Sequence, residues 1–206
     1  MLLEINSQNP ESRKIDRVVE VLKSGGVIII PTDTVYALAC DIKNAKAIDK
    51  VSLIKGTKIE KANFSFLMND LTALSFYTKP FDRHIFKMLN KALPGPYTFI
   101  LEANNEVPAI FRSKKKTIGI RVPDNKITQA LIEALGNPLM ATSIHDDDSV
   151  KDYITDPFDV FEKYGTRIEM MIDGGISKNI ASTVVDCTDN EIKIIREGLG
   201  SVDIIS

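Results

Sequence analysis

The feature that most limits the possible folds is the regular alternation along the chain of short β-branched runs and amphipathic segments. Residues 27–30 form a continuous apolar run of strand length, and Pro31 closes it. Before this run, apolar residues recur at helical spacing through residues 11–23, and Gly25-Gly26 end the pattern. Strands that alternate with helices in this way favour a sheet covered by helices, which is the α/β class.

The same alternation of helix-like and strand-like segments continues through the chain. Helical spacing with a capping residue or a glycine stop predicts helices over residues 45–55, 83–92, 125–135 and 157–164. Apolar or alternating runs predict strands over residues 63–68, 97–102, 117–121, 139–143, 170–173, 182–186 and 191–196. Because the sequence has no internal repeat and no Gly/Ser linker, we expect one α/β domain of the α+β type over residues 1–206. Its sheet should be twisted and mixed, with helices on its flanks.

Charge and composition exclude several classes of protein. The 206 residues include 26 Lys and Arg against 28 Asp and Glu, so the net charge is −2 and any nucleic-acid contact must come from a local basic patch. Cys40 and Cys187 lie far apart, and there are two histidines, so we expect no zinc site of the Cys/His kind. The first residues lack the pattern of a signal peptide, and no apolar run is long enough to cross a bilayer. We therefore expect a cytoplasmic protein with reduced thiols and no membrane contact.

The sequence lacks the usual phosphate-binding motifs, G-x-x-x-x-G-K-[ST] and G-x-G-x-x-G after a strand. A nucleotide would therefore have to be held by cationic side chains and by hydroxyl groups at strand ends. Thr34 and Tyr36 follow the buried strand at residues 27–30, at a place where ligands usually bind in open sheets. Either they and Thr32 bind a small polar ligand, or Asp33 caps a following helical turn.

Two groups of basic residues allow both a functional and a structural interpretation. Lys55, Lys58 and Lys61 either line an anion site or form a solvated face. Arg121 ends a basic stretch, residues 112–121. An arginine at a strand end can bind a carboxylate or a phosphate through two hydrogen bonds, which lysine cannot do.

Polar residues near the later strands complete the candidates. Ser143 ends a predicted strand, but no local base and acid would make it a nucleophile. Ser182 and Arg196 are polar residues on predicted strands, where a buried strand avoids them unless they are used. The acidic run at residues 146–148 either meets a divalent cation or forms a solvated loop.

Taken together and in order, these segments resemble the YrdC/YciO family of threonylcarbamoyl-adenylate synthases and their paralogues. The resemblance runs from about Ile15 to Gly200. The segments that carry it are residues 25–36, 93–98, 117–123, 141–143, 173–175, 182–186 and 194–198. It implies a single three-layer domain with a wide, positively lined cleft. Residues 63–65, Asn-Phe-Ser, and residues 94–99 look closer to the YciO branch.

The resemblance also implies a reaction. Members of the family combine threonine, bicarbonate and ATP into threonylcarbamoyl-AMP and release pyrophosphate, for the modification of an adenosine in certain tRNAs, and some bind double-stranded RNA. We therefore expect a nucleotidyltransferase that acts in translation, with ATP as substrate and Mg²⁺ beside the cationic residues. Two alternatives stay open: a tRNA- or double-stranded-RNA-binding module without synthase activity, and a carbamoyl-adenylate transferase with another acceptor.

The resemblance assigns roles to the positions that match the family's motifs. The catalytic positions are Lys55 and Arg121. The residues expected to hold threonine are Thr34, Tyr36, Arg121 and Ser182. The residues expected to contact the nucleotide are Lys55, Thr117, Ser143 and Arg196. The lysines expected to bind RNA are Lys114, Lys115 and Lys116.

Three positions depart from the synthase pattern. Thr57 stands where the synthases carry the arginine of a lysine-x-arginine pair, and His145 replaces the asparagine of serine-x-asparagine. Met68 falls where the synthases carry a histidine. A lost charged hydrogen bond costs roughly 1.5–3 kcal/mol of binding, so these changes weaken the expected synthase site.

Overall fold

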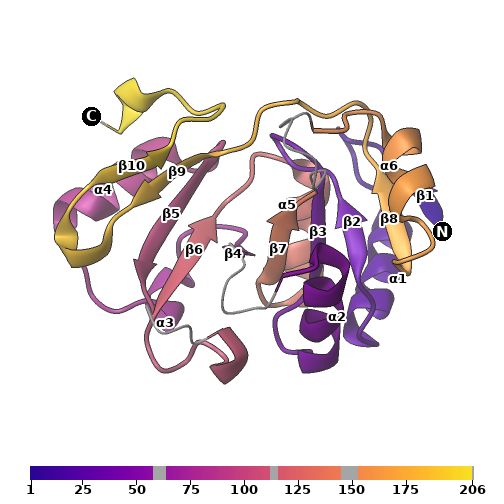
Figure 1. The fold of residues 1–206 in the computed structure, drawn as a ribbon, viewed down its shortest axis with the longest axis horizontal. Coiled ribbons are helices and arrows are strands. Elements are labelled where there is room, and N and C mark those ends of the chain that lie inside the picture. Colours follow the sequence, from indigo (N-terminus) through magenta and orange to yellow (C-terminus); the bar gives the residue numbers. More distant parts are fainter. Residues whose placement is uncertain (58–63, 112–115, 145–152, 206) are drawn as a thin grey trace.

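The computed structural model describes residues 1–57, 64–111, 116–144 and 153–205, and in this part of the chain ten strands form one mixed sheet (Figure 1). The strands are β1 (Leu2–Glu4), β2 (Ile28–Ile30), β3 (Ala37–Asp41), β4 (Ser65–Leu67), β5 (Tyr97–Glu102), β6 (Thr117–Arg121), β7 (Leu139–Ser143), β8 (Met170–Asp173), β9 (Thr183–Asp186) and β10 (Lys193–Arg196). The α-helices are α1 (Ser12–Lys23), α2 (Ala45–Lys55), α3 (Leu74–Tyr77), α4 (Arg83–Ala92), α5 (Lys126–Leu135) and α6 (Pro157–Tyr164).

Both parallel and antiparallel pairs hold the sheet together, in the order β1-β8-β2-β3-β7-β4-β6-β5-β9-β10. The parallel pairs are β1–β8, β8–β2, β4–β6 and β5–β9. The antiparallel pairs are β2–β3, β3–β7, β7–β4, β6–β5 and β9–β10. The predicted fold class, a single domain with a mixed sheet and flanking helices, is confirmed.

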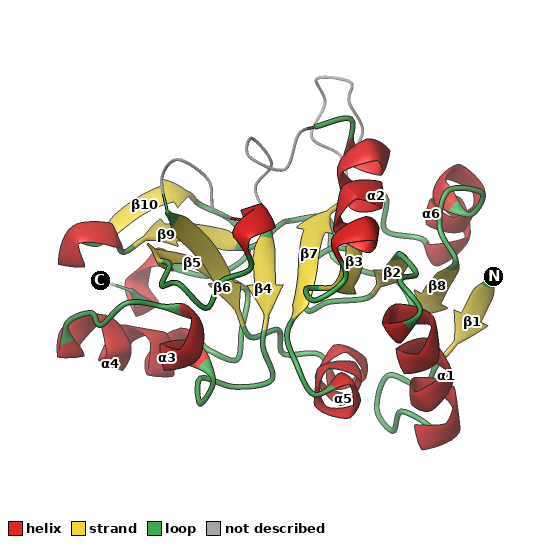
Figure 2. Cartoon of the chain, turned by 90° about the horizontal axis from the view of Figure 1, so that it is seen from below, coloured by secondary structure: helices red, strands yellow, loops and turns green. Residues whose placement is uncertain are grey.

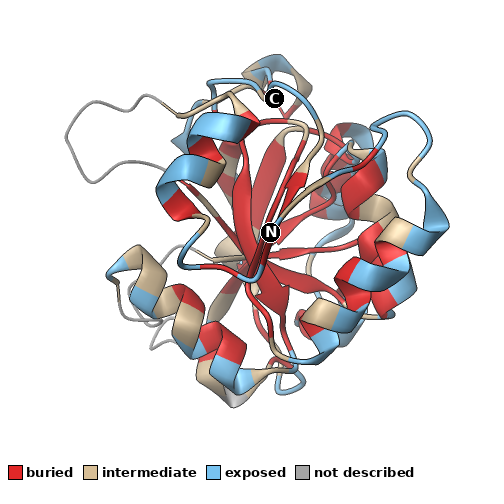
Figure 3. Cartoon of the chain, turned by 90° about the vertical axis from the view of Figure 1, so that its right-hand side faces the viewer, coloured by how far each residue is buried: buried red, intermediate tan, exposed pale blue. Residues whose placement is uncertain are grey.

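Helices cover the two faces of the sheet in different places. Side chains of α1 and α5 pack on one face, around Ile28, Ala39 and Leu139. Side chains of α2, α3, α4 and α6 share a second core with the other face, around Leu38 and Phe99. Figure 2 shows α2 and α6 above the sheet at one end, and α3 and α4 below it at the other end. Helices of one core can lie on opposite sides of this view because the sheet twists from strand to strand. The buried strands lie between helices whose outer sides are exposed (Figure 3).

The twist leaves one part of the sheet without an α-helix over it. The face that α1 and α5 cover on the first strands continues onto β6, β5, β9 and β10, where it is turned toward the viewer in Figure 1 and no described α-helix covers it. On this side Ile100, Val184 and Asp186 are partly exposed, whereas Phe99 and Val185, which point to the other side, are buried. We call this part of the sheet the open face.

Local sequence signals set the helix ends as predicted. The side chains of Asn44 and Asn125 accept hydrogen bonds from backbone amides three residues later, at the starts of α2 and α5. Gly56 and Gly136 follow these helices in the left-handed conformation, which glycine adopts without strain. Asp156 caps α6.

Some elements differ from the sequence predictions. The patterns do not predict β1, β3 or α3, because β1 and α3 are very short and β3 is buried on both sides, so it lacks alternation. Asp82 precedes α4 as predicted but makes no side-chain capping hydrogen bond. Residues 31–36 contain no helical turn, so the alternative in which Asp33 caps one is wrong.

Substitution of Phe66, a residue of β4, tests how the larger core is packed. Its ring is 2% exposed and makes edge contacts with Tyr77 and Phe111, at 5.6 and 5.1 Å between ring centroids. Because alanine would leave a cavity, we expect Phe66→Ala to lower the free energy of unfolding by about 3–5 kcal/mol in a urea titration. Phe158→Ala is the control, since Phe158 is 67% exposed and should lose less than about 1 kcal/mol. Equal losses in the two variants would contradict this description of the core.

Candidate functional site

Arg121, at the end of β6, lies at the centre of a cluster of polar side chains. Its Nη2 atom donates to Oδ1 of Asp33 at 2.5 Å, to Oγ1 of Thr34 at 2.7 Å and to Oγ1 of Thr32 at 3.3 Å. All three acceptors belong to the segment that follows β2. The side chains of Arg121 and Asp33 are only 9% and 10% exposed, so the two charges form a buried ion pair.

Each member of this ion pair keeps one polar atom without a partner. Nε of Arg121 and Oδ2 of Asp33 are buried and form no hydrogen bond with the described part of the chain. Buried polar atoms are normally satisfied, and leaving one unpaired costs roughly 1–3 kcal/mol. A donor and an acceptor held by one ion pair suit a ligand that carries both a carboxylate and an amino group.

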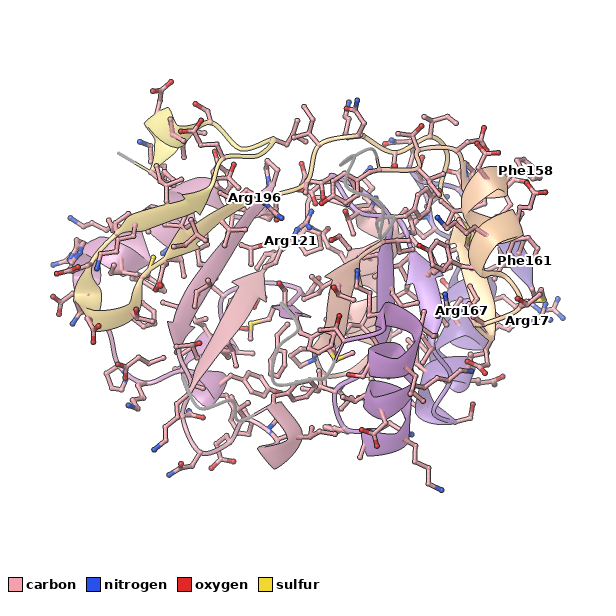
Figure 4. All side chains as sticks on the ribbon, in the orientation of Figure 1. Arg17, Arg121, Phe158, Phe161, Arg167 and Arg196 are labelled. Carbon is pink, nitrogen blue, oxygen red and sulfur yellow. The ribbon has the colours of Figure 1, made fainter. Side chains whose placement is uncertain are left out.

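A second arginine lies on the same open face. The register of β5 and β6 sets Thr98 opposite Arg121, and Oγ1 of Thr98 lies 2.9 Å from Oγ of Ser182. Arg196 donates from Nε and Nη2 to the carbonyl of Ser182, at 3.2 and 2.8 Å. Figure 4 shows the guanidinium groups of Arg121 and Arg196 pointing into the same region over the sheet. The structure therefore brings Arg121, Ser182 and Arg196 together.

Lys55 approaches the cluster from the other half of the molecule. It ends α2, and its Nζ donates to the carbonyl of Ser143 at 2.9 Å. Ser143 in turn pairs with Ala37, which follows directly on residues 31–36. The structure therefore places Lys55 and Ser143 next to each other, where the segment that carries Asp33 and Thr34 enters β3.

Tyr36 makes structural contacts through its hydroxyl group. The hydroxyl donates to the carbonyl of Gly175 at 2.7 Å and accepts from the amide of Gly174 at 3.3 Å. Burial raises the pKa of Tyr36 to about 12, so the hydroxyl is protonated and neutral at physiological pH. These bonds tie residues 31–36 to the end of β8. The predicted contact of Tyr36 with threonine stays a prediction.

Residues 174–181, which we call the crossing segment, run from β8 to β9 and pass from one half of the sheet to the other (Figure 1). The amide of Lys178 donates to the carbonyl of Thr34 at 2.8 Å. The contacts of this segment leave no pattern in the sequence, because its partners are distant along the chain; Tyr36 and Gly175 are 139 positions apart. The Gly174-Gly175 pair is the signal that marks it, since Gly175 has a φ of 93°, which favours glycine.

The side chains of the other predicted residues that the structure describes form no hydrogen bond with Arg121, although the backbone amide of Met68 donates to the carbonyl of Arg121 at 2.9 Å. Thr117 begins β6 on the same face as Arg121, about 13 Å away along the strand. The hydroxyl of Thr57 donates to the carbonyl of Lys55 at 3.3 Å, and Met68 is fully buried after β4. Lys116 is exposed before β6. The predicted residues outside the described part of the chain are Lys58, Lys61, Lys114, Lys115, His145 and residues 146–148. RNA binding by the lysines stays a prediction.

The described residues hold no group of three or more His, Cys, Asp or Glu side chains that could bind a metal ion. No helix among them is long and apolar enough to cross a membrane.

Comparisons with known proteins place this chain in a family. The Sua5/YciO/YrdC family model, described as telomere recombination, matches residues 20–198. The chain is 38% identical to the uncharacterized protein YciO of Escherichia coli K12 over 199 residues, which cover 96% of this chain and 95% of YciO. The chain belongs to the Sua5/YciO/YrdC family. The prediction of this family and of its YciO branch is confirmed.

Other relatives have more specific names. The chain is 32% identical to the putative threonylcarbamoyl-AMP synthase of Methanocaldococcus jannaschii over 203 residues, which cover 96% of this chain and 93% of the relative. The crystal structure of E. coli YciO has a TM-score of 0.92 at 36% identity, with 100% of this chain and 99% of YciO covered. The crystal structure of P. abyssi Sua5 complexed with L-threonine has a TM-score of 0.87 at 25% identity, with 96% of this chain and 57% of Sua5 covered.

Removing one partner of the buried ion pair tests how strongly it holds the site together. Arg121→Met leaves the Asp33 carboxylate buried without an opposite charge, so we expect the free energy of unfolding to fall by about 3–5 kcal/mol. The double variant Arg121→Met/Asp33→Asn removes both charges and should recover about half of that loss or more. Urea unfolding measures both. A single variant as stable as the unsubstituted protein would contradict the structural importance of the pair.

The two cysteines give a test by chemical labelling. Cys40 and Cys187 are buried, and burial raises the pKa of both thiols, that of Cys187 to about 12. At pH 8, far below that value, almost none of either thiol is in the reactive thiolate form. We expect Ellman's reagent to label neither cysteine in the native protein at pH 8 and to label both in guanidinium chloride. Rapid labelling of the native protein would show that a cysteine is accessible and reactive.

Proposed function

We propose that this protein makes threonylcarbamoyl-AMP from threonine, bicarbonate and ATP. The observation that supports this most directly is the buried Arg121–Asp33 pair with its two unpartnered atoms. In the proposal, Arg121 binds the carboxylate of threonine, and Oδ2 of Asp33 accepts a hydrogen bond from its amino group. Thr34 and Ser182 supply hydroxyl groups beside Arg121. Because these groups are already fixed by one another, the ligand is oriented at a small entropic cost.

The names of relatives support the same proposal. The M. jannaschii relative is named a putative threonylcarbamoyl-AMP synthase, and the P. abyssi Sua5 structure is a complex with L-threonine. The YciO of E. coli is named an uncharacterized protein, so its similarity supports the fold and leaves the activity to experiment.

The proposed reaction has two steps. The amino nitrogen of threonine bonds to the carbon of bicarbonate, and water leaves, which gives a carbamate. A carbamate oxygen then attacks the α-phosphorus of ATP, and the bond from that phosphorus to the bridging oxygen breaks as pyrophosphate leaves with the electron pair. Neither step needs a covalent bond to the protein. The site has to align the reactants and neutralise their negative charges.

The cations and hydroxyl groups around Arg121 are proposed to hold ATP. Arg196 lies on one side of Arg121 on the open face, and Lys55 approaches from the other half of the molecule. Lys55, Arg196 and Ser143 would contact the nucleotide, and Thr117 lies on the same face about 13 Å from Arg121, a separation that an extended nucleotide can span. Mg²⁺ is proposed to enter with the phosphates of ATP.

An assay of adenylate formation tests the proposed function. Protein incubated with ATP, threonine and labelled bicarbonate should give a labelled adenylate and pyrophosphate, and both should depend on threonine. We expect Arg121→Met to lower the rate by about 10²-fold or more, because a preorganised charged donor is lost. Arg17→Met is the control and should keep the full rate, since Arg17 lies at the far edge of the molecule (Figure 4).

Three outcomes of this assay would contradict the proposal. They are no adenylate at high protein concentration, an unchanged rate in Arg121→Met, and adenylate that forms from carbamoyl phosphate but not from threonine and bicarbonate. The last outcome would favour carbamoyl transfer to another acceptor.

A further inference from the structure

The crossing segment carries a lysine, Lys178, to the proposed threonine site. The backbone amide of Lys178 donates to the carbonyl of Thr34 at 2.8 Å, and Oγ1 of the same threonine accepts from Arg121 at 2.7 Å. A single residue therefore separates the backbone of Lys178 from the guanidinium of Arg121. The flexible four-carbon stem of lysine can carry its ammonium group from this position into the site.

The ammonium group of Lys178 has no partner among the residues that the structure describes. Lys178 is exposed, and its side chain makes no hydrogen bond or ion pair with any residue that the structure describes. Asp173, the nearest acid before Lys178 in the chain, accepts from the amide of Gly175 at 2.9 Å. Asp156 follows Thr155, whose carbonyl binds the amide of Ser177, and accepts from the amide of Phe158 at 2.8 Å. No described residue therefore competes with a ligand for the positive charge of Lys178.

The proposed reaction brings negative groups together at this place. Threonine that has taken up carbon dioxide carries two anionic groups, a carboxylate and a carbamate, and the carbamate must approach an α-phosphate that is also negative. The charge of Arg121 is balanced by Asp33. Lys55 and Arg196 are held on the carbonyls of Ser143 and Ser182, on either side. The end of threonine that bears the carbamate therefore needs a further cation.

We propose that the ammonium group of Lys178 binds the carbamate formed from threonine and neutralises its charge as it approaches the α-phosphate of ATP. This inference rests on the proposed function and adds to it a residue that binds the reacting group. A cation placed where two negative charges meet stabilises the transition state more than the separate reactants.

The test is the kinetics of adenylate formation with bicarbonate as the varied substrate. Loss of a charged hydrogen bond weakens an interaction about 10–100-fold, so we expect Lys178→Ala to lower kcat/KM for bicarbonate by about tenfold or more. Lys178→Arg keeps the cation and should recover part of this loss. Threonine alone, titrated by calorimetry, should bind Lys178→Ala within about twofold of the unsubstituted affinity, because its carboxylate contacts do not involve Lys178. Lys91→Ala, an exposed lysine of α4, is the control and should change neither quantity.

The possible results separate the two proposals. An active protein whose bicarbonate kinetics are unchanged in Lys178→Ala would overturn the role of Lys178 and leave the proposed function standing. An unsubstituted protein that makes no adenylate would overturn the proposed function and this role with it. If Lys178→Ala also lost its affinity for threonine, the side chain would be supporting the site as a whole, and the carbamate role would be overturned. The hydrogen bond from the backbone amide of residue 178 to Thr34 does not need the lysine side chain. Lys178→Ala should therefore have the same melting temperature as the unsubstituted protein.

Discussion

The ion pair between Arg121 and Asp33 organises the proposed site, because it joins parts of the sheet that are not neighbours. Arg121 ends β6 and Asp33 follows β2, and β3, β7 and β4 lie between these strands. A buried charge is stable only beside an opposite one, so the segment after β2 must reach over to the end of β6. Tyr36, through its side-chain hydroxyl, and Thr34, through its carbonyl, then bind backbone groups of the crossing segment. Three distant parts of the chain therefore meet at one guanidinium group.

The open face follows from the twist of the sheet. A twist of roughly 20° between neighbouring strands approaches half a turn over ten strands, so each face of this sheet points in opposite directions at its two ends. The helices of the larger core stay with one face along its whole length, whereas α1 and α5 share the smaller core with the other face over β8, β2, β3 and β7. The uncovered end of that face is where Arg121, Thr98 and Arg196 are found. The same geometry that closes the core thus leaves these polar side chains on a face that no described α-helix covers.

The sequence predicted the parts of this structure that depend on neighbouring residues. The cap at Asn44 and the glycines that end α2 and α5 are local signals, and the structure has them where they were predicted. Asn125 was predicted as the first residue of its helix and is the cap before it. Arg121 could be chosen as a candidate because an arginine at a strand end can bind an anion through two hydrogen bonds, and Arg196 because a buried strand avoids charged residues. The bond from Lys178 to Thr34 and the buried hydroxyl of Tyr36 could not be predicted, because each depends on a contact across more than 100 residues that only the order of the strands creates.

The place of β8 between β1 and β2 has a consequence for the synthesis of the chain. β1 is the edge strand and has β8 as its neighbour, with Leu2 beside Met171. Until residues 170–173 have left the ribosome, β1 has no strand to pair with, and one side of β2 is unpaired as well. Closing so long a loop has a high entropic cost, so this side of the protein assembles late. A nascent chain that stalls before β8 would therefore expose strand edges that can pair with other chains.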